Sequence, residues 1–217
     1  MKKLMTILAL AALCVPAAAL GGHARKPPSR SQVLAAKNAA WACKALRTTM
    51  GTQAFLRTYG ANRKAHGSGA MRNAMGKCVS QKTRAIRRAG LFEPATGTLT
   101  GSSALTLTGT ISGGRPIASG TMSGALAVDL AAGTTKHGVT CAPVTGTLTL
   151  TQSSPAGTLQ KTLTSGTYCK GPTGSALVGH YTLTGAGAFA GKTGTGTELL
   201  LAPATGPMHS VEYGSFG

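Results

Sequence analysis

The chain changes its pattern at Glu93–Pro94, and this change limits the possible folds more than any other feature of the sequence. Before it, from Arg25 to Phe92, there are 15 lysines and arginines and no acidic residue. After it, from Glu93 to Gly217, five cations stand against four acids. The net charge is therefore +15 in one segment and about +1 in the other, which predicts a domain boundary at Glu93.

The segment 93–217 is rich in Thr, Gly and Leu, and its apolar residues alternate with hydroxyl residues. Alternation of this kind is typical of half-buried antiparallel strands. The predicted strand segments are 98–100, 105–108, 125–130, 147–151, 158–164, 181–184 and 197–201. Glycine-rich stretches separate them at intervals of about ten residues, which predicts an antiparallel β-barrel, with a β-sandwich as the alternative.

The segment 29–92 has a helical period instead. Ser29 and Gln32 have the spacing of a capping box, which predicts the start of a helix. The predicted helices cover residues 29–50, 52–59 and 70–89, each followed by a glycine. The sequence therefore predicts an α+β fold, in which a basic helical module (29–92) precedes the barrel domain (93–217).

The N-terminus has the three parts of a secretory signal peptide. Two lysines give a positive start, Leu4–Val15 forms an apolar run, and Ala17–Ala19 offers a small-residue cleavage site. The run is shorter than the roughly 20 apolar residues of a transmembrane helix. The sequence thus predicts a signal peptide at residues 1–19, a linker at 20–28, and a secreted protein, extracellular or associated with the cell wall, with no transmembrane segment.

Four cysteines follow the predicted signal peptide, and an even number in an exported chain indicates disulfide bonds. Three pairings are possible. We favour Cys43 with Cys78 and Cys141 with Cys169, because each pair then lies within one segment. Each bond would close a loop of about thirty residues and contribute roughly 3.5 kcal/mol in the chain-entropy model. Zinc is not expected, because the chain has no Cys-x-x-Cys or closely spaced Cys/His set.

The predicted helix 70–89 separates apolar and cationic side chains around the helical wheel, with Cys78 on the apolar side. The candidate polyanion-binding residues on its other side are Arg72, Lys77, Arg84, Arg87 and Arg88. Such a surface attracts polyanions by releasing their counterions. We expect partners among anionic cell-envelope polymers or other polyanions, and no sequence-specific nucleic acid, because aromatic residues are few. The alternative is a solvated cationic surface that only aids solubility.

Motifs for catalysis or cofactor binding are weak. Gly191–Thr193 suggests a phosphate-binding loop, but Ala186 stands where that motif needs a glycine. No two histidines have the spacing of metal ligands, although His180 and Tyr181 lie in a strand pattern and could face a barrel lumen. No catalytic residue, metal or cofactor is predicted.

Two acidic residues that lie close together can act as a catalytic acid and base. Glu93 lies at the boundary between the segments, and Asp129, Glu198 and Glu212 lie far apart in the sequence. We therefore expect the acids not to converge.

Two stretches resemble known families. One consists of Cys43–Lys44, Ala54–Phe55, Tyr59–Gly60 and Asn73–Ser80. It resembles a two-cysteine helical module of uncharacterised secreted actinobacterial proteins, which implies a secreted context and no activity. The other, His180–Gly196, contains a Gly-x-Gly-x-Phe-x-Gly run. It is similar to the strand-turn-strand of barrels related to dirigent proteins and allene oxide cyclase, which implies eight antiparallel strands around a mostly apolar lumen.

These observations lead to two hypotheses on function. The favoured one is a secreted, non-enzymatic protein whose basic helical module associates with polyanions and whose barrel is a structural or binding domain. The alternative is a barrel that binds a small apolar ligand or acts on one as a cyclase or isomerase, with His180 or Tyr181 near the lumen.

Overall fold

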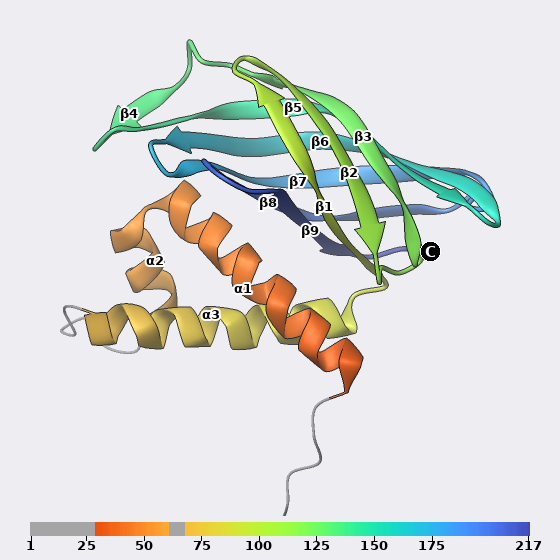
Figure 1. Ribbon diagram of the computed structural model, residues 1–217, viewed down its shortest axis with the longest axis horizontal. Coiled ribbons are helices and arrows are strands. Elements are labelled where there is room, and N and C mark those ends of the chain that lie inside the picture. Colours follow the sequence, from red (N-terminus) through yellow and green to blue (C-terminus); the bar gives the residue numbers. More distant parts are fainter. Residues whose placement is uncertain (1–28, 61–67) are drawn as a thin grey trace, which may run out of the picture.

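Eight antiparallel strands close into a barrel that rests on a layer of three helices (Figure 1). The computed structural model describes residues 29–60 and 68–217. The predicted signal peptide and linker lie outside these residues. The predicted α+β fold with a barrel is confirmed, and the sheet closes because β3 (Ser119–Val128) pairs with β5 (Val139–Ser153).

The three helices begin and end close to the predicted positions. They are α1 (Arg30–Met50), α2 (Thr52–Tyr59) and α3 (Ser68–Arg88). The predicted capping box is present: the Ser29 side chain accepts from the Gln32 backbone, and the Gln32 side chain accepts from the Ser29 backbone. Gly51 separates α1 from α2 with a positive φ of 78°, which glycine adopts without strain.

The strand order around the barrel is β3-β2-β1-β9-β8-β7-β6-β5, and β3 and β5 are paired. The short β4 (Thr134–Lys136) pairs with β5 outside this ring. The remaining strands are β1 (Leu91–Gly101), β2 (Ala104–Ser112), β6 (Ala156–Gly171), β7 (Gly174–Gly187), β8 (Thr193–Pro203) and β9 (Met208–Gly214). Each predicted strand segment falls in, or overlaps, one of these strands.

Strand β9 was not predicted, and its burial pattern explains why. Met208 and Ser210 face the barrel interior and are buried. Val211, on the other face, is also buried, because it packs against the helices. Burial on both faces removes the alternation of apolar and polar residues that marks a half-buried strand.

The barrel interior is filled with apolar side chains, mainly leucines. Leu107, Leu150 and Leu159 have no exposed surface, and Tyr181 closes the same cluster from β7. The hydroxyl residues that alternate with them lie on the outer face and are mostly exposed. The alternation in the sequence therefore separates core from solvent, as predicted.

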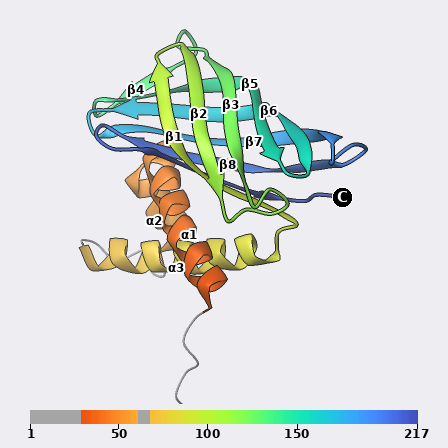
Figure 2. The ribbon, with the colours of Figure 1, turned by 45° about the vertical axis from the view of Figure 1, so that its right-hand side comes forward.

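The helices pack on the outer face of β9 and its neighbouring strands (Figure 2). Phe92 of β1 and Val211 of β9 join Ile86 of α3 in one buried cluster. Leu199 of β8 joins Phe55 of α2 in another. The helical layer thus shares its core with the barrel, although the two segments differ sharply in charge.

Both predicted disulfide bonds are confirmed. Cys43 and Cys78 join α1 to α3 within the helical layer. Cys141 and Cys169 lie directly opposite each other on β5 and β6. Each bond therefore links elements of one segment only.

Candidate functional site

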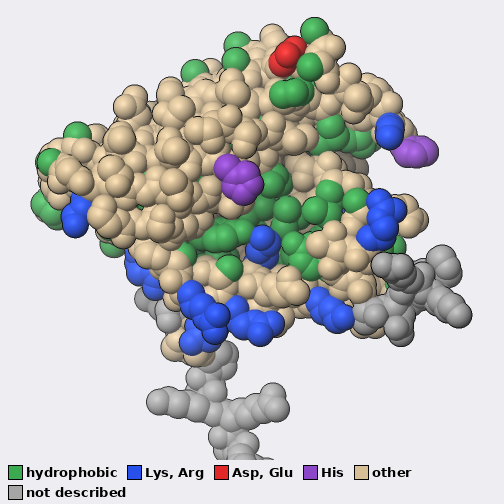
Figure 3. All heavy atoms as spheres, turned by 180° about the vertical axis from the view of Figure 1, so that it is seen from behind, with side chains coloured by type: hydrophobic (Ala, Val, Ile, Leu, Met, Phe, Trp, Pro, Cys, Tyr) green, Lys and Arg blue, Asp and Glu red, His purple; other side chains and the backbone are tan. Residues whose placement is uncertain are grey.

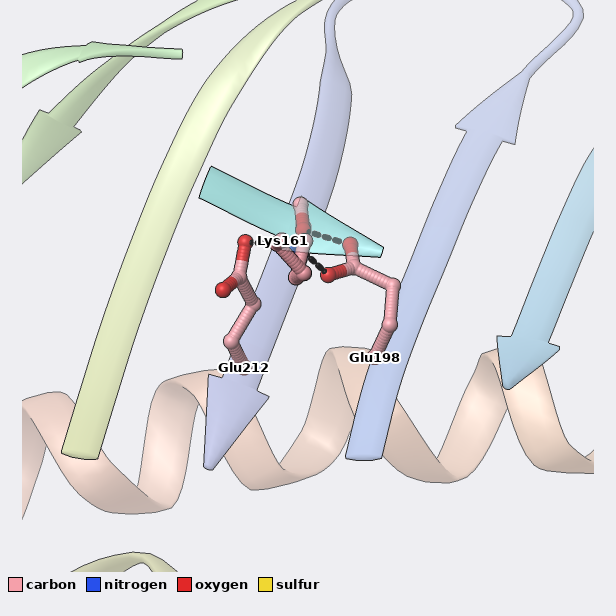
Figure 4. Close-up of polar contacts among 4 residues, drawn as sticks. Lys161, Glu198 and Glu212 are labelled. Atoms are coloured by element: carbon pink, nitrogen blue, oxygen red, sulfur yellow. Dashed lines mark hydrogen bonds and ion pairs between the residues drawn. The ribbon is translucent and has the colours of Figure 1, made fainter. Parts of the chain in front are cut away.

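A group of charged side chains lies inside the barrel. Lys161 of β6 donates hydrogen bonds from Nζ to Glu198 Oε2 of β8 and to Glu212 Oε1 of β9 (Figure 4). All three side chains are at most 1% exposed. Burial removes the hydration of each charge, so such a group is tolerated only when its members compensate one another.

Strand register brings the acids together. Glu198 lies opposite Glu212 in the β8–β9 pair, and Glu212 lies opposite Glu93 in the β1–β9 pair. Residues directly opposite each other in antiparallel strands project from the same face. The inner face of β1, β9 and β8 therefore carries a row of three glutamates.

The expectation that the acids do not converge is wrong for these three residues. The sequence hid the convergence because strands β1, β8 and β9 are distant in the chain and only barrel closure aligns them. Glu93 also lies within β1 and is fully buried. Asp129 lies apart from them, exposed after β3.

Glu93 is held by one backbone hydrogen bond. The Ile117 N–H donates to Glu93 Oε1 at 2.8 Å, and Glu93 Oε2 has no protein partner. A Cβ at Gly114 would lie 1.9 Å from this second oxygen and 2.4 Å from the Ile117 carbonyl oxygen of the backbone, so only glycine fits there. Burial raises the pKa of Glu93 to about 8, although the Ile117 hydrogen bond, Lys161 and Arg115 all act to lower it.

Two further polar groups border the buried lysine. The Ser210 hydroxyl donates to Glu198 Oε1. The Lys161 ammonium lies 5.1 Å from the centroid of the Tyr181 ring, and the Tyr181 hydroxyl has no protein partner. Burial, reinforced by Glu212 and Glu198, raises the pKa of Tyr181, so its hydroxyl stays protonated.

We call these residues the barrel polar cluster: Glu93, Lys161, Tyr181, Glu198, Ser210 and Glu212. Burial lowers the pKa of Lys161, but its ion pairs with Glu198 and Glu212 have the larger combined effect, so the pKa is raised overall. Burial likewise raises the pKa of Glu212 well above its usual value, against the opposing effect of Lys161. Three carboxyl groups thus face one ammonium group, and bound protons reduce the negative excess.

The predicted lumen residues have different positions. Tyr181 is buried in the interior, but His180 is exposed on the outer face of β7. Successive residues of a strand point to opposite faces, so the two could not both face the lumen. The suggestion that His180 faces the lumen is therefore wrong.

The predicted polyanion-binding residues all lie on α3 and are exposed: Arg72, Lys77, Arg84, Arg87 and Arg88. Seen from behind, Lys and Arg side chains line the helical side of the molecule, whereas Asp and Glu show at a single place on the barrel (Figure 3). Within residues 29–60 and 68–217, both ion pairs belong to Lys161. The cations of α3 therefore have no acidic partner in the described part of the chain.

An aromatic contact that no local sequence pattern predicts joins α1 to β9. The ring of His209 stacks on Trp41, with the ring centroids 4.0 Å apart and the planes at 15°. The Lys44 ammonium lies 4.4 Å from the centroid of the Trp41 ring. Burial, Lys37 and Lys44 together lower the pKa of His209. Only the fold brings His209 to Trp41, because the two residues lie in different segments.

Residues 29–60 and 68–217 contain neither a candidate metal site nor a candidate membrane-spanning helix. No group of three or more His, Cys, Asp or Glu side chains there is placed to hold a metal ion. No helix in that part of the chain has the length and apolar character needed to cross a membrane.

Comparisons of the chain with protein-family models, with curated proteins and with solved structures found no match. The resemblances to the actinobacterial helical module and to dirigent-related barrels therefore stay predictions.

Proposed function

We propose that this is a secreted, non-enzymatic protein whose helical layer associates with anionic polymers of the cell envelope while the barrel gives that layer a rigid support. The observation that carries the proposal is the sorting of charge. Three of the four acids are buried in the barrel, whereas most of the described cations of the helical layer, including the five candidate residues of α3, are exposed to solvent. A surface with so few anions attracts polyanions over a long range.

Three other features support the secreted location. The two disulfide bonds are typical of an oxidising compartment outside the cytosol. The predicted signal peptide would deliver the chain there, and the resemblance to secreted actinobacterial proteins agrees with that location.

The resemblance to dirigent-related barrels is in keeping with eight antiparallel strands around an apolar interior, and we transfer no activity from it.

The alternative, a barrel that holds a small apolar ligand, has less support. Leucines and the barrel polar cluster occupy the interior, and both Lys161 and Glu93 are without exposed surface.

The test compares two triple variants of the whole protein on an immobilised polyanion, at increasing salt concentration. The first changes Arg84, Arg87 and Arg88 to Gln, and the second changes Lys136, Lys170 and Lys192 to Gln. Both remove three exposed positive charges, the first from α3 and the second from the barrel. We expect wild type to be retained and released by moderate salt, because counterions compete for the polymer.

The α3 variant should bind the polymer more weakly. The plot of log affinity against log salt concentration should become less steep, with the magnitude of its negative slope reduced by about two to three. The barrel variant should change this slope by less than about one. Equal losses from the two variants would contradict a specific role of the helical layer. Absence of retention for wild type at low salt would refute polyanion association altogether.

A further inference from the structure

A small pocket lies beside the Trp41–His209 stack, and aromatic, apolar, hydroxyl and cationic side chains line it. Attraction of a polyanion by charge alone does not need such a pocket. The pocket has a volume of about 190 Å³ and lies where α1 meets strands β1, β2 and β9. Trp41 and His209 border it on one side, and Leu34 and Pro94 add apolar surface. We call this the Trp41–His209 pocket. Its volume is below the roughly 300–1,000 Å³ of pockets for drug-sized ligands, so it suits a ligand of about one ring.

The polar groups of the pocket fit a ligand with several hydroxyl groups. Thr96, Thr110 and Ser112 are exposed and line it, so their hydroxyls can each donate and accept hydrogen bonds. The Lys37 ammonium adds a cationic donor at the same pocket. Apolar wall, hydroxyl groups and a cation match the ring carbons, hydroxyls and carboxylate of an acidic sugar.

Among residues 29–60 and 68–217, no acidic side chain pairs with the positive charges around His209. Lys37 and Lys44 lie four residues before and three residues after Trp41, so all three share one side of α1. The residues opposite His209 on the neighbouring strands are Thr96 on β1 and Leu201 on β8, and both are uncharged. Burial is the main cause of the lowered pKa of His209, and the ammonium groups of Lys37 and Lys44 lower it further. A bound anion would supply the missing negative charge.

A nucleobase is a poorer match for this pocket. Bases bind single-strand sites largely by stacking on a free aromatic face. His209 already stacks on Trp41, and the Lys44 ammonium also lies over the same indole ring. A base would have to displace these contacts, whereas a sugar ring can occupy the space beside them.

We propose that the Trp41–His209 pocket binds one anionic sugar unit of an acidic polysaccharide. The inference rests on the proposed association with polyanions and names the polymer class that the helical layer would recognise. The cations of α3 then provide attraction without chemical discrimination. The pocket provides recognition of the sugar.

The chain contains a single tryptophan, so its fluorescence reports this pocket directly. We would titrate the whole protein with three probes: trigalacturonate, which is an anionic sugar; maltotriose, which is a neutral sugar; and inorganic tripolyphosphate, which is an anion without sugar. Trigalacturonate should change the Trp41 emission at a concentration about tenfold lower than either of the others, a difference of the size that one ion pair and its hydrogen bonds provide.

Acidity gives a second readout. A bound carboxylate favours the protonated imidazole, so it raises the pKa of His209, and binding strengthens as pH falls. Between about pH 8 and pH 5 the affinity for trigalacturonate should rise several-fold. His209→Gln should abolish this pH dependence, and Lys37→Gln should weaken binding about fivefold to tenfold. His180→Gln and Lys192→Gln, which change exposed residues outside the pocket, are the matched controls.

Each other result has a defined meaning. Equal responses to tripolyphosphate or to maltotriose would overturn the assignment to an anionic sugar, as would affinities that the pocket variants leave unchanged. If wild type still adheres to the polyanion column in that case, the proposed function stands without this pocket. If trigalacturonate binds but the column retains nothing, the pocket stands and polyanion association fails.

Discussion

Lys161 and the exposed lysines of α1 carry the same ammonium group in opposite surroundings. Lys161 is buried in the barrel between two glutamates, whereas Lys37 and Lys44 are exposed and form no ion pair within the described part of the chain. The difference shows how a chain with four acids and 22 cations distributes its charge. Three of the acids form an internal structural group, so the outer surface is more positive than the near-neutral composition of residues 93–217 suggests.

The first prediction concerns the buried lysine and carries the largest expected effect. Lys161→Met leaves two carboxyl groups without their cation, and a broken buried ion pair destabilises a protein by about 3–5 kcal/mol. Urea unfolding near neutral pH measures this loss. Lys170→Met, on an exposed position of the same strand, should change stability by less than about 0.5 kcal/mol.

A compensated variant sharpens that result. When Glu198→Gln and Glu212→Gln accompany Lys161→Met, no buried charge is left unpaired at these positions, and much of the lost stability should return. A triple variant no more stable than Lys161→Met alone would show that the lysine acts through packing rather than charge.

The second prediction concerns the helical layer. Changing both Cys43 and Cys78 to Ala opens a loop with a sequence separation of 35 residues. The chain-entropy model then gives a loss of about 3–4 kcal/mol. Thermal unfolding of the oxidised variant and wild type gives the difference. A loss below about 1 kcal/mol would mean that contacts between helices and barrel hold the layer without the bond.

The third prediction uses the pH dependence of Glu93. In the folded protein Glu93 keeps its proton up to about pH 8, whereas its ordinary pKa is 4.5. Between these values the folded state binds more protons than the unfolded state, so stability falls as pH rises and levels off above about pH 8. This group can contribute a slope of up to about 1.4 kcal/mol per pH unit.

Glu93→Gln removes this contribution because the amide does not titrate. Unfolding midpoints measured from about pH 5 to pH 8.5 should therefore fall less steeply in the variant than in wild type. Glu212, whose pKa is also raised, maintains part of the slope in both proteins. Identical slopes would contradict a proton on Glu93 in the folded state.

The smallest effect is expected outside the barrel. Changing Arg84, Arg87 and Arg88 to Gln should alter the unfolding free energy by no more than about 0.5 kcal/mol per site, because these side chains are exposed and form no ion pair among the described residues. Thermal unfolding provides the measurement. A large loss would indicate that the cations of α3 stabilise the fold, which would weaken their assignment to a partner.

Much of the fold follows from local patterns in the sequence. The Ser29–Gln32 capping box marks the start of α1, and the Leu–Thr alternation marks most of the barrel strands. The favoured cysteine pairing, which keeps each pair within one segment, is also correct. These signals are readable because each depends on residues that are close together in the chain.

The barrel polar cluster and the Trp41–His209 pocket could not be read in this way. Lys161, Glu198 and Glu212 come from three strands, and their proximity depends on register and closure. Strand β9 supplies both Glu212 and His209, yet it lacks the alternation that identifies a strand. Strand β9 therefore completes both the barrel polar cluster and the Trp41–His209 pocket, although its sequence does not show the pattern of a strand.

The pairing of β1 with β9 also affects how the chain reaches its folded state. Leu91 lies opposite Gly214, so the first and last strands of the barrel are neighbours. The barrel cannot close until β9 has left the ribosome and, if the protein is exported, the translocation channel. Contacts between such distant residues slow folding. A chain truncated before Met208 would lack β9, so the edges of β1 and β8 would be exposed and Lys161 would keep only one carboxylate partner. We therefore expect such an incomplete chain to be degraded by proteases more readily than the whole protein.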